Sequence, residues 1–362
     1  MKIIFFVLLL FISLFSFTQT DSNSVAVANN PFTLSGAVDV YYAWDFNEPQ
    51  TKDRQYTTQA ARHNEFNLNW GYLLASYNDQ KMRGNFGMQT GTYPQFNYAA
   101  EPNELTRMIY QANAGIRLHK KIWLDMGILP SHIGYENTLC CLNEIYTRAL
   151  MAENSPFYST GVQLSIAVSE KLSMSFVGLN GWQNIAETNN SKSVGMNLNY
   201  NTGKLILNYS NYYGNEGSRN IGGLYVGQKM RFFNHSYLRY NFTDKFHAVV
   251  SLDYGMQELL DTNKTGNWYT GMFIMQYKFN EKLAVATRIE QFIDKNQIVV
   301  SSGTKNGFQT SGGSLNFDYS PFEFCMLRLE ARYYSSKDFV FTAGNWASKD
   351  NFLLASGLVV KF

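Results

Sequence analysis

The chain has 362 residues, of which 45% are hydrophobic, 16% aromatic and only 16% charged, and its net charge is +2. So small a charge gives no basic surface for nucleic acid, and the scarcity of charged residues beside 24 Tyr and 27 Phe is unusual for a cytosolic enzyme. The length suits two or three ordinary domains or one large all-β unit.

The first 20 residues have the pattern of a secretory signal peptide. One Lys precedes an apolar core of about 15 residues, Ile3–Phe17, which then gives way to polar residues. This run is shorter than the about 18 residues that a membrane-spanning helix needs, and no later run reaches that length. We therefore expect residues 1–20 to be removed, residues 21–32 to form a short N-terminal segment, and residues 33–362 to form one domain.

Apolar and polar residues alternate with a period of two from Thr33 onward, which predicts β-strands with one apolar face. In the stretch 245–257, Val250, Leu252 and Tyr254 share one face, opposite Ser251 and Asp253. The same alternation in 65–72 places Phe66, Leu68, Trp70 and Tyr72 on one face, opposite Glu65, Asn67, Asn69 and Gly71.

Short polar turns alternate with longer connections along the whole chain. The short turns fall near Asn78, Lys120, Glu170, Thr202, Asp244, Glu281 and Ser320. The longer connections fall near 47–61, 93–106, 131–157, 183–192, 214–227, 258–267, 293–307 and 336–350. This spacing leaves room for about 16 strands.

These features together predict an all-β transmembrane antiparallel β-barrel with about 16 strands, short periplasmic turns and long extracellular loops. A barrel in lipid must be closed, because an open edge leaves backbone groups without hydrogen-bond partners. We therefore expect the strand 351–362 to pair with the strand around Val38. Its outward residues would be Phe352, Leu354, Ser356, Leu358, Val360 and Phe362.

Several longer motifs resemble those of the β-barrel porins of the OmpL-like family, found in the outer membranes of Bacteroidetes-type bacteria. They are "DVYYAWDFNEP" (39–49), "RHNEFNLN" (62–69), "QTGTYPQFNYAAEPN" (89–103), "WLDMGILPSHIGYEN" (123–137), "ALMAENSPFYSTGVQLS" (149–165), "LNGWQNI" (179–185) and "YYGNEG" (212–217). The resemblance implies an outer-membrane porin that passes small hydrophilic solutes by passive diffusion. It also implies contact with outer-membrane lipid and with the barrel-assembly machinery, for which Phe362 resembles the recognition signal. By analogy with general porins, a homotrimer is one possible oligomeric state.

Strand parity predicts which charged residues line the lumen, because charge at bilayer depth must face water or a partner. The pore-lining candidates are Asp39, Glu65, Arg83, Arg117, Asp125, Arg239, Asp253, Arg288, Glu290, Asp318, Arg328, Glu330 and Arg332. Both signs are mixed, so strong ion selectivity is not expected. Arg288, Arg328 and Arg332 either orient passing solutes or simply cross-link the inner wall.

The longest connection, 131–157, is the candidate constriction loop. Its polar candidates are His132, Glu136, Glu144, Arg148 and Glu153. The loop either folds into the lumen and narrows it or lies outside the barrel. Cys140 and Cys141 either form a vicinal disulfide or stay free thiols. With only three Cys, and no His or Cys at ligand spacing from this pair, no metal site and no cofactor are expected.

The sequence offers little support for catalysis, so we do not expect an enzyme. Ser131, His132 and Glu136 are close along the chain, but no nucleophile-elbow motif accompanies them. The alternative function is a non-conducting outer-membrane barrel whose extracellular loops bind a partner. A filled lumen would favour that alternative. A lipid-modifying barrel enzyme and a soluble β-protein are the remaining alternatives.

Overall fold

The computed structural model describes residues 30–217, 229–259 and 264–362. The predicted signal peptide and most of the segment 21–32 lie outside the described residues. Residues Phe32–Phe362 form one compact unit. No helix in the described ranges is long and apolar enough to cross a bilayer.

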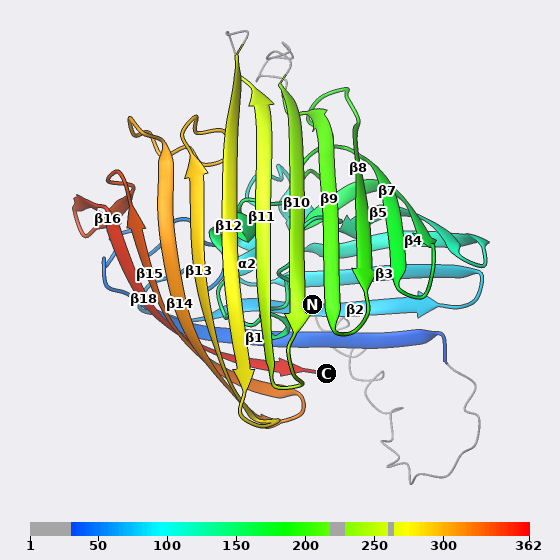
Figure 1. Cartoon of the computed structure of the whole chain (residues 1–362), viewed down its shortest axis with the longest axis horizontal. Helices are drawn as coiled ribbons and strands as arrows, with labels where there is room; N and C mark the ends of the chain where they lie inside the picture. The colour runs from blue at the N-terminus through cyan, green and yellow to red at the C-terminus, as the bar shows by residue number, and fades with distance from the viewer. Residues whose placement is uncertain (1–29, 218–228, 260–263) are drawn as a thin grey trace, which may run out of the picture. The chain divides into compact units, whose positions relative to one another are not determined.

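In this unit sixteen antiparallel strands form a closed barrel, as the alternation and turn spacing predict (Figure 1). The strands are β1 (Phe32–Asp45), β2 (Phe66–Asn78), β3 (Met82–Thr90), β4 (Ile109–His119), β5 (Ile122–Pro130), β6 (Tyr158–Ala167), β7 (Leu172–Leu179), β8 (Ser193–Asn201), β9 (Leu205–Asn215), β10 (Met230–Asn241), β11 (Phe246–Glu258), β12 (Thr265–Lys278), β13 (Leu283–Asp294), β14 (Phe308–Phe322), β15 (Cys325–Ser336) and β18 (Asp350–Lys361). Each strand pairs with its neighbours in this order.

The barrel closes between the first and last strands, as the sequence predicts. Val38 lies opposite Val360 in the β1–β18 ladder, and in Figure 1 red β18 runs beside blue β1. Two further backbone hydrogen bonds join Gly36 and Phe362, with N–O distances of 2.8 and 3.0 Å. Closure leaves no unpaired strand edge in the hydrocarbon region, which is the condition for a β-structure to span lipid.

The alternation of apolar and polar residues decides which side chains face lipid. On β11, Val250, Leu252 and Tyr254 are exposed on the outer surface, whereas Val249 and Asp253 are buried inside the barrel. On β18, Phe352, Leu354, Leu358 and Val360 are likewise exposed on the outside. The predicted parity of these strands is confirmed.

The alternation predicted for 65–72 is wrong from its sixth residue, Trp70, onward. The β1–β2 register shifts between Asp39 and Val40, so that Asp39 lies opposite Trp70 and Val40 opposite Leu68. This extra residue on β2 is a β-bulge, which reverses the faces of the residues that follow it. Trp70 and Tyr72 therefore pack in the interior of the barrel, while Phe66 stays exposed outside.

The connections alternate between short and long, and several long ones contain secondary structure. They include the helices α2 (Thr92–Asn97), α3 (Glu104–Arg107) and α4 (Leu150–Glu153), the 3₁₀ turn η2 (Cys140–Leu142) and the hairpin β16 (Phe341–Ala343) to β17 (Trp346–Ser348). The turn predicted near Ser320 lies slightly later, because β14 continues to Phe322 through a register shift around Pro321. Proline is tolerated at such an irregularity because no ladder hydrogen bond is lost there.

Candidate functional site

Most of the predicted pore-lining charges lie on the inner faces of strands. Nine of them belong to β1, β10, β11, β13, β14 and β15. The inner faces of these six strands are called the charged wall below. Its nine charged residues are Asp39, Arg239, Asp253, Arg288, Glu290, Asp318, Arg328, Glu330 and Arg332. All nine are buried except Arg239, which is part exposed. Arg83, Arg117 and Asp125 belong to β3, β4 and β5. Glu65 lies outside the strands, because β2 begins at Phe66, and it pairs with Arg62 at 3.0 Å.

The connection 131–157 reaches the charged wall and covers it. Its Glu136 carboxylate accepts a hydrogen bond from Arg288 on β13 at 3.1 Å, and both side chains are fully buried. Arg288 also lies 3.4 Å from Glu290 and 3.7 Å from Glu330. Burial raises the pKa of the Glu136 carboxyl to about 7, and the Arg288 guanidinium acts against this rise. These contacts form a buried ionic cluster in which each charge has an opposite partner.

Carboxylates of the charged wall also bind the backbone of the loop. Glu330 accepts the Thr147 N–H at 2.7 Å, and Glu290 accepts the Leu150 N–H at 2.6 Å. Arg332 links the wall to the loop as well, since it donates to Glu290 and to the Arg148 carbonyl, each at 2.7 Å. Charge-assisted bonds to buried backbone groups are among the stronger hydrogen bonds in proteins. The wall thereby fixes the path of the loop backbone.

A second set of contacts holds the turn η2. Arg328 pairs with Asp318 at 2.7 Å and donates to the carbonyls of Cys140 and Asn143 at 2.5 and 2.9 Å. Asp39 accepts from the Cys140 thiol and the Tyr146 hydroxyl, each at 3.2 Å. Cys140 and Cys141 are free thiols.

The loop also contacts the strands β9, β10 and β11. Glu144 accepts from Tyr135 at 2.7 Å, lies 2.9 Å from the His247 ring on β11 and pairs with Arg239 at 3.3 Å. Near the start of the loop, the His132 ring contacts the Asn211 carbonyl at 2.9 Å, and burial lowers the pKa of His132. The loop therefore touches the wall at several places around the barrel.

The side chains of Glu153 and Arg148 contact connections rather than the barrel wall. Glu153 accepts hydrogen bonds from the Thr58 backbone and hydroxyl at 3.1 and 2.7 Å. The Arg148 guanidinium stacks between the rings of Tyr93 and Phe157, at 4.4 and 3.8 Å from their centroids, and its side chain is fully buried. Cation–π contacts of this kind stabilise a desolvated guanidinium.

Apolar packing joins the loop to both halves of the barrel, since Ile133 and Leu150 share a buried cluster with Val177 of β7 and Tyr212 of β9. Ala149 and Met151 of the loop form a buried cluster with Val249, Met272 and Ile274 on the inner faces of β11 and β12. Gly357 on β18 leaves the space that the Tyr146 ring fills, because an added Cβ would lie 2.5 Å from that ring. These inner-wall residues are shaped to pack against protein.

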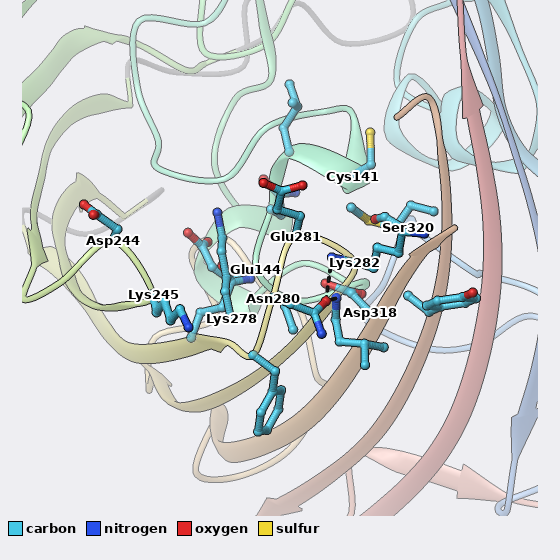
Figure 2. A pocket seen from close by; sticks show the side chains of 18 of the residues that line it. Cys141, Glu144, Asp244, Lys245, Lys278, Asn280, Glu281, Lys282, Asp318 and Ser320 are labelled. Carbon is cyan, nitrogen blue, oxygen red and sulfur yellow. Dashed lines mark hydrogen bonds between the residues drawn. The ribbon is translucent and has the colours of Figure 1, made fainter. Parts of the chain in front are cut away.

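A cavity of about 1060 Å³ lies below the loop at the short-turn end of the barrel. Figure 2 shows Cys141 and Glu144 of the loop among its lining residues, together with Lys245, Lys278 and Lys282 from β12 and the short turns. Asp244, Glu281 and Asp318 also line it, so both signs of charge are present. Within the described residues, no three His, Cys, Asp or Glu side chains are arranged to hold a metal ion.

One set of polar residues was not singled out from the sequence. In the half of the barrel near the short turns, the inner faces of β2–β9 carry uncharged amide and hydroxyl side chains, called the neutral wall below: Ser76, Asn85, Asn113, Gln163, Ser165, Ser175, Asn197, Asn199 and Asn208. All nine are part exposed. The alternation that located the charged residues also places these residues on inner faces, except Ser76, which follows the bulge on β2.

The fold is similar to that of several solved porins. An anion-selective porin from Comamonas acidovorans superposes with a TM-score of 0.59 at 12% identity, covering 91% of this chain and 99% of that one. OmpT of Vibrio cholerae, expressed in the outer membrane, gives 0.60 at 9% identity, covering 91% and 97%. A mutant of the Rh. blastica porin gives 0.52 at 10% identity, covering 91% and 100%. Identities this low show a shared fold.

Comparison with curated protein sequences gives no match. The family described as "Putative beta-barrel porin-2, OmpL-like" matches residues 31–362, which is nearly all of the chain beyond the predicted signal peptide. The motifs noted in the sequence and the closed sixteen-stranded barrel agree with this match. The chain therefore belongs to the OmpL-like β-barrel porin family, and it is an outer-membrane porin.

Proposed function

We propose that this porin passes small hydrophilic solutes by passive diffusion, and that the loop 131–157 limits the size of the solutes. The observation that carries this proposal is the binding of the loop across the lumen, from His132 beside Asn211 to Thr147 at Glu330. A barrel of about 16 strands has an interior wide enough for an aqueous channel. A loop bound inside it reduces that width.

The charged wall then has a positioning role, and the solute does not meet most of its charges. Arg288, Arg328 and Arg332 are fully buried, and each one donates to a backbone carbonyl of the loop. This favours cross-linking over orientation of solutes by these arginines. Weak ion selectivity is expected, because the buried charges neutralise one another.

The proposal includes no catalytic step and no cofactor. His132 and Glu136, two of the three residues considered for a catalytic set with Ser131, contact different partners: His132 the Asn211 carbonyl and Glu136 the Arg288 guanidinium. A nucleophile and its base need to be within hydrogen-bond reach of one another. Two residues committed elsewhere do not supply that geometry.

Replacement of residues 137–147 by a short Gly/Ser turn tests the proposal. Single-channel recording in planar bilayers should show conductance for the wild type and a severalfold larger conductance for the variant. A matched control shortens the exposed tip of the β16–β17 hairpin around Trp346, and its conductance should equal that of the wild type. An unchanged conductance after loop replacement, in a variant with normal strand content, would contradict the role of the loop.

The second candidate function is a non-conducting barrel that binds a partner through its extracellular loops. One observation favours it: the loop residues Ile145–Ala149 are completely buried, so that they fill part of the lumen. Absence of conductance at every voltage, in wild-type protein that keeps its barrel, would select this second candidate.

The proposed partners of the barrel are outer-membrane lipid and the barrel-assembly machinery, with Phe362 as the recognition signal. A homotrimer is proposed on the ground that one similar structure, OmpT of Vibrio cholerae, is described in a trimer form. Deletion of Phe362 should lower the yield of folded protein in the outer membrane more than Phe324→Ala, which removes another exposed aromatic ring near the short-turn end. Equal yields would refute the signal.

A further inference from the structure

The neutral wall differs from the charged wall in its exposure to solvent. Its nine amide and hydroxyl side chains are part exposed, whereas eight of the nine charged-wall side chains are buried. Inner-face residues of a closed barrel are shielded from lipid, so their exposed area faces the lumen. Water therefore reaches the inner faces of β2–β9 in the half of the barrel near the short turns, whereas Gln89, Ser159, Ser193 and Ser210, nearer the long connections, are buried.

The loop leaves the neutral wall largely uncovered. The hydrogen bonds between the two are made near the start of the loop, where Asn197 donates to the His132 carbonyl at 2.8 Å. Gly195 on the same strand leaves room for the His132 ring, since a Cβ there would lie 2.6 Å from its Nε2. From His132 onward the ionic contacts of the loop are with the opposite half of the barrel.

The side chains of the neutral wall bind one another and keep further hydrogen-bonding capacity. Asn85 donates to Asn113 at 2.9 Å and accepts from Ser76 at 2.7 Å. Asn197 and Asn208 donate to each other at 3.2 and 3.3 Å. A primary amide has two donor hydrogens and an oxygen with two lone pairs, so each of these amides can still bind water or a solute.

Fixed charge on this side of the barrel is small. Arg83 and Asp125 form a close ion pair with each other. Arg117 lies at the short-turn end of β4, where it donates to the carbonyls of Gln80 and Lys120. A solute that moves along this wall meets donors and acceptors but hardly any net charge.

We infer that solutes cross the short-turn half of the barrel along the neutral wall, and that its amides favour neutral polyhydroxylated solutes, such as small sugars, over ions of the same size. The inference rests on the proposed function, because it names the solute class of that channel. Hydroxyl groups donate and accept, as amides do, so they exchange water for wall contacts without loss of hydrogen bonds. An ion that sheds water there finds no opposite charge to compensate it.

The test compares glucose, gluconate and glucosamine, which have similar size and carry zero, negative and positive charge, in swelling of proteoliposomes that contain wild-type protein. Glucose should enter at least about threefold faster than either charged sugar. The variant Asn113→Asp/Asn197→Asp keeps the side-chain shape and adds negative charge. It should speed glucosamine relative to gluconate by at least about threefold and shift the reversal potential of a salt gradient toward cations.

Gln257→Glu is the matched control, since it makes the same change beside Arg231 in the buried half of the barrel, and it should leave both ratios unchanged. Equal entry of the three sugars into wild-type vesicles would overturn the inference while leaving the porin function intact. The same conclusion follows if the aspartate variant, folded as judged by its strand content, keeps the wild-type ratios. Absence of any permeation or conductance would overturn the proposed function and this inference together.

Discussion

The two halves of the inner wall use polar residues in different ways. On the charged wall, Arg288, Glu290, Glu330 and Arg332 are buried beneath the loop, and each binds a loop group or another charge. On the neutral wall, Asn85, Asn197 and their neighbours stay part exposed and uncharged. Burial without water requires that each charge is paired, whereas an exposed amide can use water as its partner. Inward charge in a barrel is therefore as consistent with a loop-binding surface as with a pore lining.

Among substitutions that compare the two walls, one on the charged wall is expected to change the free energy of unfolding most. Arg288→Met leaves Glu136, Glu290 and Glu330 without their shared partner in a site that excludes water. We expect the free energy of unfolding to fall by about 3–5 kcal/mol, the usual cost of a broken buried ion pair. Urea unfolding in lipid vesicles, followed by tryptophan fluorescence, measures it.

Arg83→Met supplies the comparison, because the Arg83 side chain is 31% exposed and part of its charge is already screened by water. Its free energy of unfolding should fall by clearly less than that of Arg288→Met. If the two variants lost the same stability, the distinction between a dry half and a wet half of the barrel would fail.

A smaller effect is expected from pH, through Glu136. Burial raises its pKa from an ordinary value of 4.5 to about 7 in the folded protein. Below pH 4.5 both the folded and the unfolded states hold the proton. As pH rises toward 7 the unfolded state releases it first, so the wild type loses stability relative to Glu136→Gln. The gap between the two proteins should change by about 1–3 kcal/mol across this range and then stay constant.

Unfolding curves of both proteins at several pH values between 4 and 8 check this prediction. The other titrating groups are common to both proteins and cancel in the difference. A gap that is independent of pH would mean that Glu136 ionises normally, as an exposed loop carboxylate does.

The alternation of apolar and polar residues predicted most of the fold. Alternation correctly assigned the faces of β11, β15 and β18 and the pairing of Val38 with Val360, because a period of two is a local property of the backbone. It failed at Trp70, since a bulge adds one residue and no local signal in 65–72 marks it. Bulges depend on the fit between two strands, which a single strand does not encode.

The position of the loop could not be predicted from sequence patterns. Glu136 meets Arg288 at a separation of 152 residues, and Thr147 meets Glu330 at 183. Such pairs form only once the barrel brings distant strands together. The sequence identified these residues as inward or loop charges and left open whether they orient solutes or cross-link the wall. Their burial favours cross-linking.

The smallest difference in the free energy of unfolding is expected when the same type of substitution, Asn→Ala, is made once on each wall. Asn85→Ala removes hydrogen bonds to Ser76 and Asn113, but water can replace them, so the free energy of unfolding should fall by less than about 1 kcal/mol. Asn316→Ala removes the buried amide that accepts the Tyr146 N–H at 3.1 Å and donates to Asp318 at 2.8 Å, which leaves those groups unsatisfied. Its cost should reach about 1–3 kcal/mol. Because the residue type and the substitution are identical, only solvent access separates the two variants. A larger loss for Asn85→Ala would show that the neutral wall is packed as tightly as the charged one, and solutes would then need another route through the barrel.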